Sequence, residues 1–208
     1  MNRLVMPMRK FFPLRLACVL AATLALASCS GTDQPPLEEG AIYGSTIGGA
    51  FELVNTKGET VRWSDFDGKW RMVYFGYAYC PDVCPFDVQR MTQGYNAFAA
   101  KNPALADDVV PIFITIDPQR DTPEVIGQFA GNMSDKLVGL TGTQEQVDKA
   151  ADAFAVYRKK GTVNEEGGYL MDHTNIGYLM GRDGAPIALL PVDVSGDAVA
   201  QELQKWVR

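Results

Sequence analysis

The chain has 208 residues, of which 47% are hydrophobic and 21% are charged. This composition is that of an ordinary globular domain with an appendage, and it excludes a disordered, collagen-like or multi-span membrane protein. The 19 Lys and Arg residues against 25 Asp and Glu residues give a net charge of -6. Because the chain is acidic, we expect no nucleic-acid partner, and small molecules, metals or proteins with basic faces fit it better.

The first 28 residues have the pattern of an export signal. Four basic residues and no acidic ones precede an apolar run of about 12 residues from Leu16 to Ala27. This run is shorter than the roughly 20 residues that a membrane-spanning helix needs, and it fits the apolar region of a secretory signal. An uncleaved signal anchor is the alternative. Cleavage before Cys29 would leave 15 basic against 25 acidic side chains.

The end of this segment, Leu26-Ala27-Ser28-Cys29, resembles the bacterial lipobox. That resemblance implies that Cys29 becomes the lipidated first residue of an exported protein, anchored at the periplasmic face of a bacterial membrane. The following residues are polar, rich in Pro and Gly, and without periodicity, which is typical of a linker. We therefore expect a signal peptide over residues 1–28, a flexible tether over residues 29–44 and one domain over residues 45–208.

Within the domain, the sequence predicts strands and helices in alternation. Two strands, Phe51–Val54 and Val61–Trp63, form a hairpin, and an apolar strand follows at Met72–Phe75. Apolar residues at steps of three and four predict a helix over Phe86–Ala100, with Pro85 suited to its first turn. The later elements are a strand over Val109–Ile116, a helix over Glu124–Ala130, a strand over Leu137–Leu140, a helix over Thr143–Val156 with a Thr143/Gln146 capping box, a hairpin through Asn164–Gly168, strands over Ile176–Met180 and Ile187–Leu190, and a helix over Asp197–Val207.

This order predicts an α/β fold. The βαβ unit gives the sheet a parallel portion, and the terminal hairpin gives it an antiparallel one. A pair of cysteines on the loop after the first strand of the βαβ unit, opening a helix, is the thioredoxin arrangement. We therefore predict a thioredoxin-like three-layer sandwich with an N-terminal β-hairpin and a mixed central sheet.

Two cysteines remain for chemistry, because Cys18 lies in the signal and Cys29 would carry lipid. Cys80 and Cys84 lie in the segment YCPDVCP. If Cys84 lies in or next to the first helical turn, the unpaired N–H groups and the helix dipole favour its thiolate. The separation allows the two sulfurs either to bond or to share one ion, so a structural disulfide is the simple alternative.

His173 is the only histidine in the chain. A lone histidine is more often a surface or satisfied residue than a ligand. Its neighbours Asp172 and Asn175 could orient the imidazole through a hydrogen bond, as carboxylates do for metal-bound histidines. Spacing alone does not connect His173 to the cysteines.

Three segments together resemble the signatures of the Sco/SenC family. They are YCPDVCP at residues 79–85, TIDPQRDTP at residues 115–123 and DHT at residues 172–174. The resemblance covers about residues 45–208, with one small departure at Thr174, where many members have Ser. It implies a membrane-tethered thioredoxin-fold protein that binds copper and helps to assemble the dinuclear copper centre of cytochrome c oxidase.

Carried over by motif, the copper ligands would be Cys80, Cys84 and His173. Two thiolates and one imidazole form a soft donor set that suits Cu(I), and Cu(II) stays open. Three-coordination leaves a position at which a receiver can attack the metal. The implied partners are the copper-bearing subunit of cytochrome c oxidase and, beyond it, other copper chaperones or thiol reductants.

The alternative hypothesis is that the protein is a thiol–disulfide oxidoreductase, which reduces the cysteines of the oxidase copper site through Cys80 and Cys84. A peroxidase-like site is a weaker third alternative. Thioredoxin-type enzymes carry a cis proline facing the dithiol, whereas residues 170–176 contain no proline and offer His173. We therefore expect a metallochaperone rather than an enzyme, with thiol–disulfide reductase activity as a further possibility.

We expect the TIDPQRDTP motif to have a structural role rather than a catalytic one. Asp121 or Thr122 can cap the following helix, with Pro123 at its first position. Asp117 is a candidate for supporting the metal ligands from the neighbouring loop. Tyr77 and Tyr79, which precede the cysteines, are expected to wall the site.

Lipidation of Cys29 can be measured by labelling cells with radioactive palmitate. The protein should incorporate the label, and Cys29→Ser should abolish it, because the thioether linkage requires this sulfur. Label that persists in Cys29→Ser contradicts the anchor.

Overall fold

The computed structural model describes residues 34–208, and its compact unit spans Pro35–Arg208. The predicted signal peptide and Cys29 lie outside the described residues. Within the described range, no helix has both the length and the apolar character needed to span a membrane.

The centre of the domain is a seven-stranded sheet with the order β2-β1-β5-β4-β3-β8-β9. Neighbouring strands β3, β4 and β5 are parallel, whereas β1, β2, β8 and β9 join antiparallel. The predicted mixed sheet and N-terminal hairpin are confirmed. The strands are β1 (Glu52–Asn55), β2 (Thr60–Arg62), β3 (Trp70–Gly76), β4 (Val109–Thr115), β5 (Val138–Thr141), β8 (Gly177–Met180) and β9 (Pro186–Leu190).

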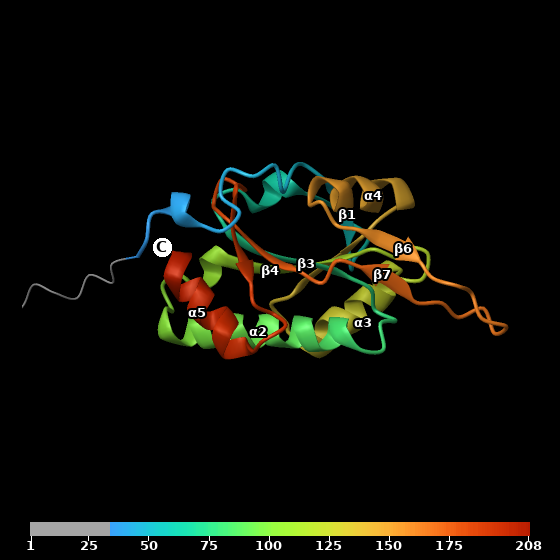
Figure 1. Cartoon of the computed structure of the whole chain (residues 1–208). Coiled ribbons are helices and arrows are strands. Elements are labelled where there is room, and N and C mark those ends of the chain that lie inside the picture. Colours follow the sequence, from blue (N-terminus) through green and yellow to red (C-terminus); the bar gives the residue numbers. More distant parts are fainter. Residues whose placement is uncertain (1–33) are drawn as a thin grey trace, which may run out of the picture. The chain divides into compact units, whose positions relative to one another are not determined.

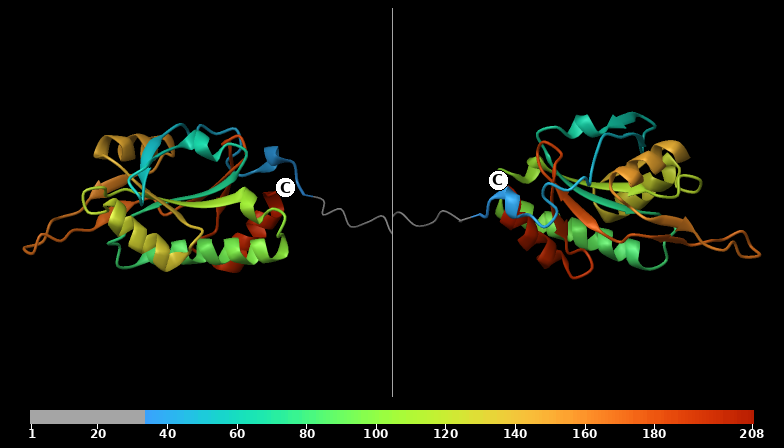
Figure 2. Two further views of the ribbon diagram at one scale, coloured as in Figure 1. Left: turned by 180° about the vertical axis from the view of Figure 1, so that it is seen from behind. Right: turned by 45° about the horizontal axis from the view of Figure 1, so that its top comes forward.

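Helices cover both faces of this sheet, which gives the predicted three layers (Figure 1). Helices α2 (Val83–Lys101), α3 (Pro123–Met133) and α5 (Gly196–Trp206) lie on one face, and α4 (Gln144–Ala153) lies on the other, as the two further views in Figure 2 also show. Three short 3₁₀ helices complete the described part: η1 (Leu37–Glu39), η2 (Trp63–Phe66) and η3 (Ala106–Asp108). The predicted thioredoxin-like α/β fold is therefore confirmed.

Two helix starts are fixed by their caps. The Thr143 hydroxyl accepts the Gln146 N–H at 3.2 Å, and the Gln146 side chain accepts the Thr143 N–H at 2.9 Å, which confirms the predicted capping box. For the start of α3, the sequence analysis left open whether Asp121 or Thr122 is the cap. Thr122 is the cap, accepting the Val125 N–H at 3.3 Å, and Pro123 is the first helical residue.

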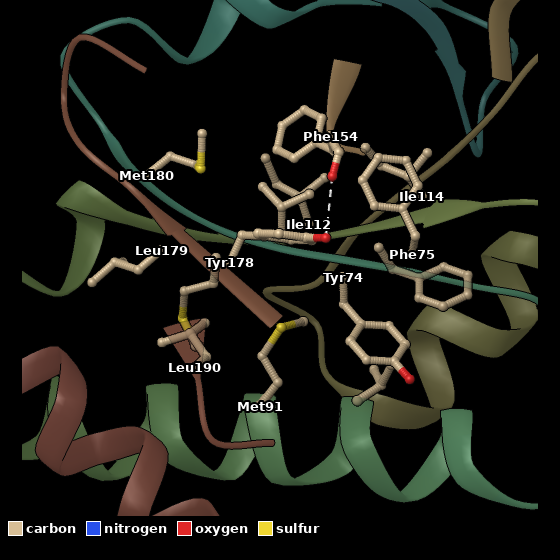
Figure 3. Close-up of a cluster of buried hydrophobic side chains, with 14 of the residues drawn as sticks. Tyr74, Phe75, Met91, Ile112, Ile114, Phe154, Tyr178, Leu179, Met180 and Leu190 are labelled. Carbon is tan, nitrogen blue, oxygen red and sulfur yellow. Dashed lines mark hydrogen bonds between the residues drawn. The ribbon is translucent and has the colours of Figure 1, made fainter. Parts of the chain in front are cut away.

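Strand β3 is buried on both faces, as its apolar sequence predicts. Tyr74 points toward α2, where its hydroxyl donates to the Asp87 carboxylate at 2.9 Å. Phe75 points to the opposite face and packs against Phe154 with ring centroids 5.2 Å apart. Figure 3 shows this core, with Met91 reaching up from α2 and the Tyr178 hydroxyl bonded to the Phe154 carbonyl. The strand that leads to the cysteines is thus held rigidly between two packed layers.

The described end of the predicted tether packs on the domain. Leu37 and Ile42 contact the core, and the Ile42 N–H donates to the Ile187 carbonyl at 3.2 Å. Arg208 donates to the Pro35 carbonyl at 3.0 Å. The compact unit therefore begins about ten residues before Ser45, where the sequence analysis placed its start.

The predicted hairpin through residues 164–168 is a separate two-stranded sheet of β6 (Arg158–Lys160) and β7 (Met171–His173). We call the segment from Arg158 to His173 the β6–β7 hairpin; Figure 1 shows it extending from the body of the domain. In its register Arg158 lies opposite His173. His173 therefore lies at the base of a hairpin that does not belong to the central sheet.

Two helical glycines allow a matched test of packing. At Gly94 in α2, a Cβ atom would lie 2.5 Å from the Val199 side chain of α5, whereas at Gly131 in α3 it would meet nothing within 4 Å. Gly131→Ala should raise the free energy of unfolding by up to about 1 kcal/mol, because alanine has the better helix propensity. Gly94→Ala should lower it by about 1–3 kcal/mol, because the two helices must separate. Urea denaturation measures both changes, and equal effects would contradict the close approach of α2 and α5.

Candidate metal centre

The two cysteines lie where β3 passes into α2, at the carboxyl end of the parallel strands. We call residues 77–84 the dithiol loop. Cys84 is in the first turn of α2 and fully buried, whereas Cys80 is partly exposed, and neither forms a disulfide. A Cβ atom on Gly76 would lie 3.2 Å from the Cys84 sulfur, so the absence of a side chain at this position lets the thiol pack onto the end of β3.

His173 lies against Cys84 although 89 positions separate them in the chain. Its Nε2 is 3.3 Å from the Cys84 Sγ, and its Nδ1 is 2.9 Å from the Thr174 carbonyl oxygen. Because a carbonyl can only accept, Nδ1 carries the proton and donates it, and Nε2 turns its lone pair toward the sulfur. Burial lowers the pKa of His173, so the ring is neutral near pH 7. A neutral imidazole nitrogen with a free lone pair is the form that binds metals.

The expected orienting role of Asp172 is not what the structure has. Side chains alternate along β7, so Met171 and His173 point inward and Asp172 is exposed. The proton on Nδ1 is bound by the Thr174 carbonyl instead. The backbone of the residue after the histidine therefore fixes the ring, a role that the side chains flanking His173 do not indicate.

Burial decides the protonation of Cys84. The sequence analysis expected the helix start to favour its thiolate, but burial raises the pKa of this thiol well above its ordinary value, and the neighbouring Cys80 raises it further. Cys84 is therefore a thiol in the protein without metal. A bound cation would remove this penalty, because it supplies a positive charge where the proton was.

Tyr77 connects Cys80 to the hairpin. Its side chain is buried, and the Cys80 side chain and the Met171 backbone are its neighbours. Its ring meets the His173 ring edge-on at a centroid distance of 5.9 Å. Burial raises the pKa of Tyr77 to about 12, so the hydroxyl is a neutral donor. Tyr77 thus walls the site, whereas Tyr79 is mostly exposed.

Cys80 and His173 share the lining of an open cavity of about 450 Å³. The only charged side chains in this lining are those of Asp82 and Asp172. Within residues 34–208, no three Cys, His, Asp or Glu side chains are already arranged around one point as a complete metal site. Cys84 and His173 are in contact, and Cys80 lines the same cavity as His173.

Asp117 lies in a neighbouring cluster and not at the sulfurs. Its carboxylate accepts from Arg120 Nε at 2.6 Å and from the Tyr169 hydroxyl at 2.8 Å. Asp121, buried nearby, accepts the Thr115 hydroxyl at 2.6 Å and the Ala78 N–H at 2.9 Å. The sequence analysis missed Arg120, Tyr169 and Gly76, and only the TIDPQRDTP motif gave a signal for Arg120.

A family model, curated relatives and solved structures all point to the same family. The SCO1/SenC family model matches residues 39–208. The mitochondrial SCO1 homolog of Homo sapiens is 44% identical over 138 residues, which are 66% of this chain and 45% of the human protein. The SenC protein of Rhodobacter capsulatus is 43% identical over 137 residues, covering 64% of this chain and 58% of that protein. Bradyrhizobium japonicum ScoI, solved with copper bound, is 34% identical with a TM-score of 0.70, covering 77% of this chain and 99% of that chain.

The buried Asp121 should give the folded protein a measurable pH dependence. Burial raises its pKa to about 6, although the bonds from Thr115 and Ala78 favour the charged form. Since an unfolded aspartate has a pKa near 3.9, the folded protein binds this proton more tightly. The stability that Asp121 contributes is therefore largest below about pH 4 and is lost as the pH rises to about 6.

Asp121→Asn should remove this dependence, because asparagine keeps the accepting oxygen and does not titrate. The variant should gain stability relative to the native chain by about 3 kcal/mol between pH 4 and pH 7. Chemical denaturation at each pH measures the difference, and the exposed Asp107→Asn controls for loss of one negative charge. A difference that does not change with pH contradicts the raised pKa.

Proposed function

Since this chain belongs to the SCO1/SenC family, we propose that it is a copper metallochaperone of cytochrome c oxidase assembly. It holds copper through Cys80, Cys84 and His173 and delivers it to, or prepares, the dinuclear copper centre of the oxidase. Copper is its cargo. The observation that carries the proposal is the contact of 3.3 Å between the neutral His173 Nε2 and the buried Cys84 sulfur.

The donor set fits copper. Two sulfurs and one imidazole are soft ligands that suit Cu(I), whereas a structural zinc site has four protein ligands. Cys84 and His173 already face one another, and the partly exposed Cys80 lies in the turn before α2 begins. With Cys80 as the third donor, the site is three-coordinate with an open position, from which a receiver can take the metal.

The relatives support copper as the cargo. Bradyrhizobium japonicum ScoI is solved with copper bound, and so is yeast Sco1, which is 29% identical to this chain with a TM-score of 0.70. The chain spans about half the length of the human SCO1 homolog, so the partner and the delivery step are part of the proposal.

The surface around the cavity supports docking of a protein receiver. Five exposed apolar side chains lie on the dithiol loop, near the start of α2, just before β6 and on the hairpin, and three of them, Val83, Tyr157 and Leu170, line the cavity; the other two are Tyr79 and Phe86. Such a cluster is more typical of a protein contact than of a free surface. The copper-bearing oxidase subunit is the receiver that we propose, with lipid at Cys29 keeping the chain at the periplasmic face of the membrane.

The alternative function, thiol–disulfide reduction, rests on the unequal exposure of the two thiols. Cys80 is accessible to a target disulfide, and the buried Cys84 could resolve the mixed disulfide. Against it, residues 170–176 contain no proline, and His173 of this stretch lies against Cys84. We therefore rank copper delivery first.

Cu(I) titration of the reduced domain tests the proposal. His173→Ala should weaken Cu(I) binding by more than about 100-fold, since loss of a ligand costs more than loss of a group supporting one. Asn175→Ala is the control, because it lies on the same cavity wall and offers no soft donor. X-ray absorption should count two sulfurs and one nitrogen around the metal in the native protein.

The same variant, His173→Ala, distinguishes copper delivery from disulfide reduction. A copper chaperone loses its metal in His173→Ala, whereas a reductase keeps its activity on a disulfide substrate because both thiols remain. Full Cu(I) affinity in His173→Ala contradicts the proposed ligand set.

A further inference from the structure

The β6–β7 hairpin has little backbone support for the position of His173. Its two strands have three residues each, and they form their own sheet instead of joining the central one. A two-stranded hairpin alone is marginally stable in water. Side chains must therefore hold this hairpin against the body of the domain. Besides the contacts of His173 with Cys84 and Tyr77, two groups of polar contacts do so, one at each end of β7.

At the end nearest His173, Arg158 ties the hairpin to α4. Its Nε donates to Asp148 at 2.7 Å, and its Nη1 donates to Asp152 at 2.8 Å. These bonds fix the hairpin to the layer on the far side of the sheet. They make no connection to the dithiol loop.

The other contacts run through the loop between β4 and α3, residues 116–122. Arg120 Nη1 donates to the Tyr169 carbonyl at 2.9 Å, just before β7 begins. The Arg120 guanidinium lies 3.6 Å from the Tyr169 ring centroid, with Asp117 bonded to both residues. Lys160 of β6 packs on the same ring at 3.8 Å. Arg120, Asp117 and Tyr169 therefore form a closed cycle of contacts between this loop and the hairpin.

The same loop also holds the dithiol loop. The Arg120 guanidinium lies 5.6 Å from the Tyr77 ring centroid and 5.1 Å from that of Tyr79. Asp121 binds the Ala78 N–H at 2.9 Å. One short segment thus contacts both halves of the proposed copper site, the loop that carries the cysteines and the hairpin that carries the histidine.

We propose that Arg120, with Asp117 and Tyr169, is a positioning group that latches the β6–β7 hairpin over the dithiol loop and so sets the approach of His173 to the cysteines. We call these three residues the hairpin latch. When the latch is closed, His173 meets Cys84. When it opens, the imidazole moves away and the sulfurs become accessible to a receiver. The part that concerns copper rests on the proposed function, and the part that concerns the hairpin does not.

The geometry makes arginine specific at this position. Its fork bonds the Asp117 carboxylate and the Tyr169 carbonyl at once while its plane stacks on the tyrosine ring. Lysine would keep the charge beside Asp117 but would lose the fork and the stacking. Arg120→Lys should therefore restore only part of what Arg120→Ala removes.

The first experiment measures amide hydrogen exchange in the reduced protein without metal. In Arg120→Ala, the amides of β6 and β7 should exchange about tenfold faster, with Arg120→Lys intermediate and the central sheet unchanged. Arg182→Ala is the matched control. This arginine also bonds a carboxylate and carbonyls, those of Asp108, Gly68 and Arg208, but it lies at the opposite end of the central strands, where β3 and β4 begin. It should leave the hairpin amides as they are.

The second experiment loads each variant with Cu(I) and follows transfer to a competing chelator. Arg120→Ala should release copper about tenfold faster than the native protein, and Arg182→Ala should release it at the native rate. The Cu(II)-loaded forms, read by nitrogen hyperfine coupling in electron paramagnetic resonance, should show a weakened imidazole signal in Arg120→Ala only.

The outcomes separate the latch from the copper function. If the native protein binds no copper but hairpin exchange rises in Arg120→Ala, the proposed function fails and the mechanical role of the latch stands. If the native protein binds copper and Arg120→Ala matches it in hairpin exchange and release rate, the latch is wrong. Equal effects in Arg120→Ala and Arg182→Ala also overturn it, because they would reflect general stability.

Discussion

The contact between His173 and Cys84 is the interaction on which the rest of the site depends. It exists because three conditions meet at one point. The Thr174 carbonyl accepts a hydrogen bond from Nδ1–H, burial keeps the ring neutral, and the absence of a side chain at Gly76 leaves room for the sulfur. The result is a nitrogen lone pair facing a buried thiol. Replacing the proton between them by a soft cation satisfies both groups and removes the cost of burying a thiolate.

The fold supplies this contact by bringing two kinds of element together. Strand β3, packed on both faces, gives the cysteines a rigid base at the carboxyl end of the parallel strands, where α/β sheets bind their ligands. The histidine comes from a hairpin outside that sheet, held by side chains. One half of the site is therefore fixed by the core, and the other half is held by a small number of polar and ring contacts. In the proposed delivery of copper, only the second half would have to move.

Much of this architecture could be predicted from the sequence. The periodicity of α2 and the apolar run of β3 are strong local signals of a helix and a strand. Thr143 and Thr122 indicate where their helices start, because threonine is a common N-cap residue. The packing of Leu37 and Ile42 on the core could not be predicted, because these residues have no periodicity and only tertiary packing decides their position. The start of α2 lies at Val83 rather than Phe86, since Pro85 fits several positions of a first turn.

The site was harder to predict for a physical reason. No local rule brings His173 to Cys84 or Tyr169 to Arg120, because these pairs form only when distant segments pack. The resemblance to a family predicted the first pair, and nothing in the sequence predicted the second. The protonation of Cys84 was misjudged because a helix start is visible in sequence, whereas full burial is not. Asp172 was chosen as a neighbour in sequence, and the alternation along a strand turned it outward.

The docked N-terminal segment has a consequence for a lipid-anchored chain. Only five residues lie between Cys29 and Pro35, so even a fully extended chain from one to the other reaches roughly 20 Å. The domain of such a chain would thus lie close to the bilayer surface. In Figure 1, η1 and the β6–β7 hairpin lie at opposite ends of the domain. Anchorage through the proposed lipid would therefore leave the hairpin that carries His173 at the end away from the attachment point, open to an incoming partner.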